Sequence, residues 1–318
     1  MDHPSSPRIA IVGAGAVGSF FGGMLARAGH HVVLVARAPH VQAIARQGLR
    51  MLLQDGSTHC VAVAASTELD VVRDCELVLC CVKSRDTAEV ARSLAPLLTP
   101  RALVLSLQNG VENPALLARE LARPVLPVAV YVAVAMAEPG LVRHFGRGEL
   151  VLGPRTPEEA ADGKLRARLL QLVEVFDAAG IPLRISECVM DDLWSKLLVN
   201  CAFNAISALS RQPYGRMVEQ EPIRALQQAV VQEVLEVARA CGRHIDPLQA
   251  GEAVQAIGRS MAGQLSSTAQ DLMRGRPTEI DDLNGCIVRL GAAHGIATPA
   301  NQALHALVKL AEGAATAG

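Results

Sequence analysis

The sequence predicts an α/β fold, with a doubly wound parallel sheet in an N-terminal domain and an all-α helical C-terminal domain. Three observations carry this prediction. At 318 residues the chain is long enough for two domains. Its first half alternates short aliphatic runs with helical stretches, whereas no strand pattern recurs after about Glu187. We therefore expect one domain over residues 1–187 and a second over residues 188–318.

Five short runs in the first half have the Val, Leu and Ile content of strands buried in a parallel sheet. These predicted strands are Ile9–Val12, Val32–Ala36, Leu77–Val82, Leu103–Leu107 and Val125–Val134. A helical pattern over Val17–Ala28 separates the first two and stops at Gly29, which completes a strand–helix–strand unit. Residues 141–153 are expected to form a hairpin that closes the domain, followed by a helix over Lys164–Ala179.

Helical periodicity alone characterises the second half of the chain. The predicted helices are Asp191–Leu209, Pro222–Cys241, Leu248–Met261, Thr278–His294 and Asn301–Glu312. A polar stretch, Gly263–Pro277, interrupts them. These helices carry enough apolar surface to support a homodimer; the alternative is that this surface packs within the chain.

Composition excludes several classes of function. With 50% hydrophobic and only 3% aromatic residues, the core is expected to be aliphatic. A net charge of −1 supplies no field to attract nucleic acid or an anionic membrane, so a small-molecule partner is predicted. The eight cysteines lack metal-ligand spacing, which predicts no metal site and reduced thiols in the cytoplasm. Met1–Arg8 lacks the features of a signal peptide, and the longest apolar run, Val125–Ala137, is too short to span a membrane.

A glycine-rich motif lies directly after the first predicted strand, where the first predicted helix begins. It consists of Gly13, Ala14, Gly15, Ala16, Val17 and Gly18. In such a GxGxxG loop the first glycine permits the tight turn, the second lets the backbone approach a pyrophosphate, and the third lets the helix pack on the strand. The order strand, motif, helix, strand predicts a dinucleotide-binding domain of the Rossmann type.

The end of the second predicted strand indicates which dinucleotide binds. An NAD site usually has a carboxylate there to hold the ribose hydroxyls, but this chain has Ala36-Arg37. A guanidinium is suited to bind the 2′-phosphate of NADPH, so Arg37 predicts NADPH as the cofactor. The alternative is that Arg37 is an ordinary solvated loop residue.

The helix predicted over Asp191–Leu209 is apolar on most sides, as a buried helix is. Its polar exceptions are spaced i, i+4, i+8 and i+11, so they form one stripe of Lys196, Asn200, Asn204 and Ser207. Because such groups are costly to bury without partners, either they pair with another helix or they line the cleft between the domains and bind a ligand. The second interpretation suits reduction of a 2-oxo acid, since a lysine can stabilise and protonate the oxygen that becomes negative as hydride arrives.

Further segments add polar groups to the predicted site. Gln108-Asn109-Gly110 and Lys83 each follow a predicted strand, at the end of the sheet where ligands bind in such folds. Downstream, Ser266-Ser267 and Thr278-Glu279 combine hydroxyls with a carboxylate. A simple Asn-Gly turn, a surface lysine and a helix cap are the alternative interpretations of these segments.

These motifs together resemble the ketopantoate reductase family (2-dehydropantoate 2-reductases) over nearly the whole chain. The resemblance rests on the segments GAGAVG, VKS, QNGVEN, WSKLLVNCAFNAISAL and SSTAQDLMRGRPTEIDDLNG. It implies NADPH-dependent reduction of ketopantoate to pantoate, which feeds pantothenate and coenzyme A synthesis.

The resemblance also implies roles for individual residues. The implied general acid is Lys196. The implied substrate-binding residues are Asn109, Lys196, Asn200, Asn204 and Ser267. The implied cofactor contacts outside the glycine-rich loop are Arg37, Lys83, Asn109 and Glu279. One position departs from some members of the family, because Tyr214 stands where they have a further substrate-contacting asparagine, so the pocket wall is expected to differ there.

Other functions fit parts of the pattern. A reductase of another small 2-oxo acid would use the same lysine chemistry. The β-hydroxyacid dehydrogenases also use a helical lysine with a nearby asparagine, but their sequence signatures are not visible in this chain. A non-catalytic NADPH-sensing protein would need the glycine-rich loop but not the lysine–asparagine stripe.

Overall fold

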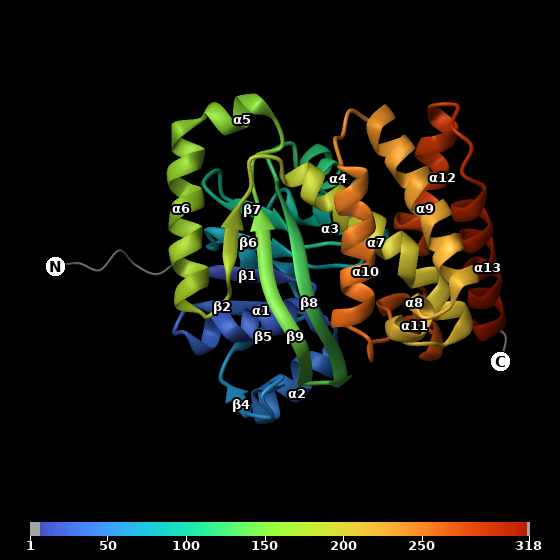
Figure 1. Ribbon diagram of the computed structural model, residues 1–318. Helices are drawn as coiled ribbons and strands as arrows, with labels where there is room; N and C mark the ends of the chain where they lie inside the picture. Colours follow the sequence, from blue (N-terminus) through green and yellow to red (C-terminus); the bar gives the residue numbers. More distant parts are fainter. Residues whose placement is uncertain (1–6, 317–318) are drawn as a thin grey trace. The chain divides into compact units, whose positions relative to one another are not determined.

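A computed structural model of the chain describes residues 7–316 (Figure 1). The chain divides into two compact units. The first unit runs to Gln108 and resumes over Glu112–Val189, and the second joins Asn109–Val111 to the chain from Met190 onward. The polypeptide therefore enters the helical unit twice. The predicted lack of a signal peptide over Met1–Arg8 falls largely on residues that lie outside the described part.

The first unit is built on a ten-stranded sheet in the order β4-β3-β9-β8-β7-β6-β1-β2-β5, with β10 paired to β9. Its strands are β1 (Ile9–Val12), β2 (Val32–Val35), β3 (Leu49–Leu52), β4 (Thr58–Val61), β5 (Ala64–Ser66), β6 (Leu77–Cys80), β7 (Leu103–Ser106), β8 (Leu126–Glu138), β9 (Leu141–Leu152) and β10 (Leu183–Ile185). Strands β5, β2, β1, β6 and β7 are parallel, and β7 also pairs in parallel with the start of β8. The predicted parallel sheet is confirmed for these strands, whereas β8 pairs antiparallel with β9 and β3 with β4, so the ten-stranded sheet as a whole is mixed.

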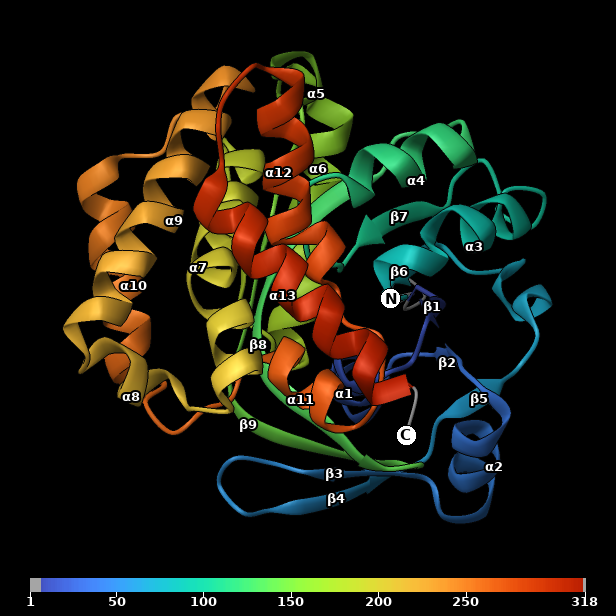
Figure 2. The ribbon, with the colours of Figure 1, turned by 90° about the vertical axis from the view of Figure 1, so that its right-hand side faces the viewer.

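Helices cover this sheet on two faces because successive side chains of a strand point to opposite sides. The helices of the unit are α1 (Ala16–Arg27), α2 (Ala38–Gln47), α3 (Thr87–Leu94), α4 (Asn113–Leu121), α5 (Pro157–Ala161) and α6 (Gly163–Ala178). Ile9 and Ile11 of β1 belong to a core cluster with residues of α1 and α6. Ala10 and Val12 belong to a second cluster with residues of α3 and α4, which lie beside β6 and β7 in Figure 2. The sheet is thus doubly wound, as predicted.

Residues 141–153 do not form a hairpin of their own, so that prediction was wrong. Leu141–Leu152 is the single strand β9, which pairs antiparallel with β8 across the turn at Gly140. The Gly146-Arg147-Gly148 segment resembles a turn in sequence, but it accommodates shifts of register between the two long strands. All three residues have positive φ angles, which is the conformation that bulges in strands often need.

The second unit is all-helical in its part from Met190 onward, as predicted. Its helices are α7 (Val189–Ser210), α8 (Tyr214–Val218), α9 (Glu221–Ala240), α10 (Pro247–Ser260), α11 (Ser267–Met273), α12 (Asn284–Ala293) and α13 (Pro299–Thr316), with a 3₁₀ turn, η3, at Ile280–Asp282. None of the helices in residues 7–316 has both the length and the apolar character needed to cross a membrane.

Two expectations for this unit need correction. The polar stretch Gly263–Pro277 contains the short helix α11, whose first turn is capped by the Ser266 hydroxyl. The helix predicted to begin at Thr278 instead begins at Asn284, after η3 and a break at Leu283 (φ −108°, ψ −104°). The reason for the second difference is tertiary, because Thr278 donates hydrogen bonds to Glu312 of α13 rather than starting a helix.

Candidate active site

The glycine-rich loop joins β1 to α1, and two of its glycines are required by packing. Gly13 has a φ of +90°, and a Cβ atom there would lie 2.6 Å from the backbone nitrogen of Val82. A Cβ atom on Gly18 would lie 2.7 Å from the carbonyl oxygen of Gly13 and 2.8 Å from Ile11. Larger residues at either position would therefore force the loop, the strand or the helix apart.

Gly15 is different, because neither its backbone nor its surroundings require a glycine. Its φ of −73° is open to any residue, and a Cβ atom there would meet no heavy atom within 4 Å. What this glycine keeps clear is the space beside the N-terminus of α1, where no side chain caps the first backbone N–H groups. An open approach to unsatisfied N–H donors fits the pyrophosphate of a dinucleotide.

The strands on either side of β1 place two cations after their carboxyl ends. Arg37 follows β2 at the start of α2, and Lys83 follows β6; both side chains are exposed. The loop is tied to the first of these strands, because the backbone nitrogens of Gly13 and Ala14 both donate to Val35 of β2. Arg37 forms no ion pair within residues 7–316, so its guanidinium is available to a phosphate.

The helical unit brings together three polar residues that lie far apart in the sequence. The Lys196 ammonium on α7 donates a hydrogen bond of 2.9 Å to the Asn109 side-chain oxygen. The Asn109 amide nitrogen in turn donates to the Glu279 carboxylate at 3.2 Å. All three side chains are partly buried. The result is a chain of hydrogen bonds from a carboxylate, through a neutral amide, to an ammonium group.

The other members of the α7 stripe have different surroundings. Asn200 is half-buried and has no hydrogen bond within the described residues. Asn204 is only 2% exposed, and its side-chain oxygen accepts a hydrogen bond from the Tyr214 hydroxyl at 3.3 Å. Ser207 is fully buried and holds the turn that follows the helix, donating to the Gln212 carbonyl and accepting from the Ser266 backbone nitrogen. Ser207 is thus a structural member of the stripe.

The two serines at the start of α11, Ser266 and Ser267, differ in burial and in role. Ser266 is buried, caps α11 by accepting from Ala269, and donates to the Asn204 carbonyl oxygen. Ser267, the predicted substrate-binding residue, is the first residue of α11 and is exposed. The bond between Ser266 and Asn204 therefore fixes the start of α11, which carries Ser267, against α7.

Comparison with protein-family models decides the family. The model described as ketopantoate reductase PanE/ApbA matches residues 9–157, and the model described as ketopantoate reductase PanE/ApbA C terminal matches residues 188–312. The chain belongs to the ketopantoate reductase family. The predicted family and the predicted class of enzyme, an oxidoreductase, are thereby confirmed.

Individual proteins and solved structures match almost the whole chain. The 2-dehydropantoate 2-reductase of Halobacterium salinarum is 34% identical over 307 residues, covering 96% of this chain and 99% of that protein. The crystal structure of a PanE/ApbA family ketopantoate reductase from Ralstonia eutropha JMP134 is 49% identical, with a TM-score of 0.88 over 97% of this chain and 99% of the other. The ternary structure of D-mandelate dehydrogenase with NADH and anilino(oxo)acetate is 25% identical, with a TM-score of 0.89 and the same coverage.

A second set of polar residues supports the glycine-rich loop of this ketopantoate reductase family member, and no motif in the sequence indicated it. The Ser19 hydroxyl on α1 donates to the Ala14 carbonyl of the glycine-rich loop and bonds to Nε2 of His40. The other ring nitrogen of His40 accepts from the Gly140 backbone nitrogen, so this imidazole is neutral with its proton on Nε2. Burial lowers the pKa of His40, which keeps the ring neutral. Ser19 and His40 thus stabilise the glycine-rich loop through the Ala14 carbonyl oxygen.

The segment that carries Glu279 is anchored to α13. Glu312 accepts hydrogen bonds from both the backbone nitrogen and the hydroxyl of Thr278, at 2.7 and 2.6 Å. Lys309 bridges Glu312 and Asp281 at 2.8 and 2.9 Å. Burial raises the pKa of Glu312, but the hydrogen bonds from Lys309 and Thr278 outweigh it, so that this pKa lies below its ordinary value.

Replacing Glu312 by alanine is expected to lower the free energy of unfolding at pH 7 by about 1–3 kcal/mol, because Thr278 loses its acceptor. Since the carboxyl has a lowered pKa in the folded state, its contribution is present above the unfolded pKa and is lost as the pH falls through the folded pKa. The stability difference between the two proteins should therefore shrink in acid. Urea unfolding at pH 7 and pH 3.5 measures this, with Glu252→Ala, an exposed residue of α10, as the control. A difference that does not depend on pH would contradict the prediction.

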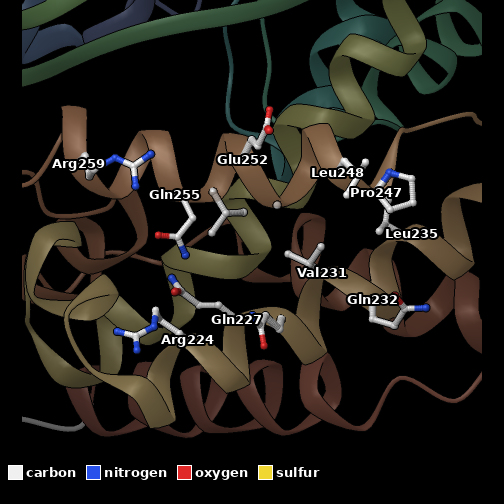
Figure 3. Close-up of a pocket in the computed structure, with 13 residues that line it drawn as sticks. Arg224, Gln227, Val231, Gln232, Leu235, Pro247, Leu248, Glu252, Gln255 and Arg259 are labelled. Carbon is white, nitrogen blue, oxygen red and sulfur yellow. The ribbon is translucent and has the colours of Figure 1, made fainter.

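A groove of about 590 Å³ lies between α9 and α10 (Figure 3). The side chains of Gln227 and Gln255 point toward one another from the two helices, and Leu248 lies farther along the groove. No predicted substrate-binding residue lines this groove. The groove is therefore separate from the hydrogen-bonded Lys196 cluster.

Proposed function

We propose that this protein reduces 2-dehydropantoate to (R)-pantoate with NADPH in the cytoplasm, as a step in pantothenate and coenzyme A synthesis. The observation that carries the proposal is the hydrogen-bonded chain from Lys196 through Asn109 to Glu279, in a member of the ketopantoate reductase family. Relatives that match nearly the whole chain are 2-dehydropantoate 2-reductases, which supports this substrate.

The proposed chemistry assigns Lys196 the role of general acid. When bound, the nicotinamide supplies hydride to the carbonyl carbon, and the electron pair of the C=O π bond moves onto oxygen. Lys196 stabilises this oxygen and donates a proton to it, giving the hydroxyl group of the product and a neutral amine that regains a proton from solvent. An ammonium group has three protons to donate, and Asn109 accepts one of those of Lys196. Glu279 holds Asn109 with its oxygen toward the lysine.

Neutral donors on α7 and α11 supply the proposed substrate contacts. Asn200, Asn204 and Ser267 offer hydrogen bonds to the carboxylate and hydroxyl oxygens of the substrate without adding charge. An acidic residue in their place would repel a 2-oxo acid. The positive charge of Lys196 then stabilises the oxygen at which negative charge develops.

Arg37→Asp is expected to reverse the preference for NADPH over NADH, because the guanidinium that would bind the 2′-phosphate becomes a carboxylate that repels it and holds the ribose hydroxyls. The ratio of kcat/KM for the two cofactors should change by at least about a hundredfold, since charge-assisted phosphate contacts of this kind contribute about 3 kcal/mol. Arg46→Asp is the matched control, an exposed arginine in the last turn of α2, the helix that begins directly after Arg37. An unchanged preference in Arg37→Asp would refute the assignment of NADPH.

One structural neighbour favours a second candidate substrate class. The D-mandelate dehydrogenase structure contains NADH and anilino(oxo)acetate, so the alternative is a reductase of another 2-oxo acid. Steady-state kcat/KM for 2-dehydropantoate, 2-oxoisovalerate and phenylglyoxylate separates the candidates. A higher value for either of the last two would replace the proposed substrate but retain the chemistry.

A further inference from the structure

The Tyr214 hydroxyl has one hydrogen-bond partner within the described residues, the side-chain oxygen of Asn204. Tyr214 is 9% exposed and Asn204 is 2% exposed. Such a buried phenol has one proton to donate, and an unpaired O–H costs more than an unpaired lone pair. The hydroxyl therefore donates and the Asn204 oxygen accepts. Burial also raises the pKa of Tyr214, which keeps the hydroxyl protonated.

This bond fixes which end of the Asn204 amide faces outward. With its oxygen bound to Tyr214, Asn204 turns its nitrogen away from the tyrosine. That nitrogen has no hydrogen-bond partner within residues 7–316, yet it is not sealed from solvent. The side chain thus presents its two N–H donors on the side away from Tyr214.

Further contacts fix the positions of Tyr214 and Asn204. The Tyr214 ring packs on the fully buried Phe203 ring, with centroids 4.6 Å apart and planes at 35°. The Tyr214 backbone nitrogen donates to the Gln264 carbonyl oxygen, and the Ser266 hydroxyl donates to the Asn204 carbonyl oxygen. The geometry of the pair is therefore set by the fold of α7, α8 and the segment before α11.

We propose that Tyr214 is a positioning residue that makes Asn204 a donor, so that this end of the α7 stripe selects substrates presenting an acceptor oxygen, such as a carboxylate oxygen of a 2-oxo acid. This inference rests on the proposed function. Tyr214 acts through Asn204 and does not itself contact the substrate. Ligands that present an N–H or ammonium group at this position are disfavoured.

Tyr214→Phe tests the coupling, because it removes the hydroxyl and keeps the ring on Phe203. The KM for the 2-oxo acid should rise about fivefold to tenfold, as the amide becomes free to turn, while kcat changes less than about twofold. In an Asn204→Ala background the same substitution should leave KM unchanged, because there is no amide left to orient. Additive effects of the two substitutions would overturn the proposal, since Tyr214 would then act independently of Asn204.

Asn204→Asp tests the direction of the hydrogen bond. With Tyr214 bound to one carboxylate oxygen, the other faces outward as an acceptor, so KM for a 2-oxo acid should exceed that of Asn204→Ala. The reverse order would show that Asn204 presents an acceptor, and would overturn the proposal. Thermal unfolding of each variant accompanies the kinetics. If the wild-type protein is folded and binds the cofactor but reduces no 2-oxo acid, both the proposed function and this inference are refuted. If the enzyme is active but the effects of the Tyr214 and Asn204 substitutions are additive, the inference alone is refuted.

Discussion

Lys196→Ala is expected to lower kcat at least about a hundredfold, the lower range for loss of general acid catalysis, without changing the dissociation constant for NADPH. The variant has no group left to protonate the oxygen that hydride transfer makes negative. Lys196 bonds to Asn109 within the helical unit, whereas the glycine-rich loop belongs to the sheet unit, so cofactor affinity should persist. Steady-state oxidation of NADPH measures kcat, and calorimetric titration with NADPH measures the dissociation constant.

Two further substitutions separate charge from proton transfer. Lys196→Arg keeps a cation but raises the pKa too far for it to donate readily, so kcat should stay low while the KM for the 2-oxo acid recovers. Lys164→Ala, an exposed lysine on α6, should leave both parameters unchanged. An effect of Lys196→Ala smaller than about tenfold would argue against Lys196 as the proton donor.

The parallel core of the sheet could be predicted because its strands are buried on both faces. Val32–Val35 and Leu77–Cys80 are continuous aliphatic runs, so composition alone identifies them. The strands at the other end of the sheet could not be recognised this way. Thr58–Val61, for example, has only one buried residue and depends on its pairing with β3. Such edge strands form because of their neighbours rather than their own composition.

The candidate site was predictable only where its residues share one element. Lys196, Asn200 and Asn204 are four residues apart, so helical geometry alone places them on one face. Helical geometry cannot predict the rest of the hydrogen-bonded chain, because Asn109 lies 87 residues before Lys196 and Glu279 lies 170 residues after Asn109. Family resemblance indicated these residues, but not the order of their hydrogen bonds. The hydrogen bond between Tyr214 and Asn204 could not be predicted either, because it depends on how α8 packs against α7.

An added methyl group is expected to affect stability very differently at two glycines of the glycine-rich loop. Gly18→Ala is expected to lower the free energy of unfolding of the sheet unit by about 3 kcal/mol, since its Cβ would be 2.7 Å from a backbone oxygen that cannot move freely. Gly15→Ala should change stability by less than about 1 kcal/mol, the usual scale for an N-cap substitution of this kind. Urea unfolding of both variants without cofactor measures the two effects.

Gly15→Ala is expected to lower cofactor affinity although it leaves stability nearly unchanged. The Gly15 methyl group projects into the space that the structure keeps clear beside the N-terminus of α1, so the dissociation constant for NADPH should rise at least about tenfold, a cost of about 1.4 kcal/mol or more. Gly29→Ala would be a poor control because Gly29 has a φ of +92°. Gly163→Ala is better, because it lies at the start of α6 with open space around it and no positive φ angle. If Gly15→Ala bound NADPH as tightly as the wild-type protein, the glycine would not be there for the pyrophosphate, and the assignment of this loop as the dinucleotide site would be wrong.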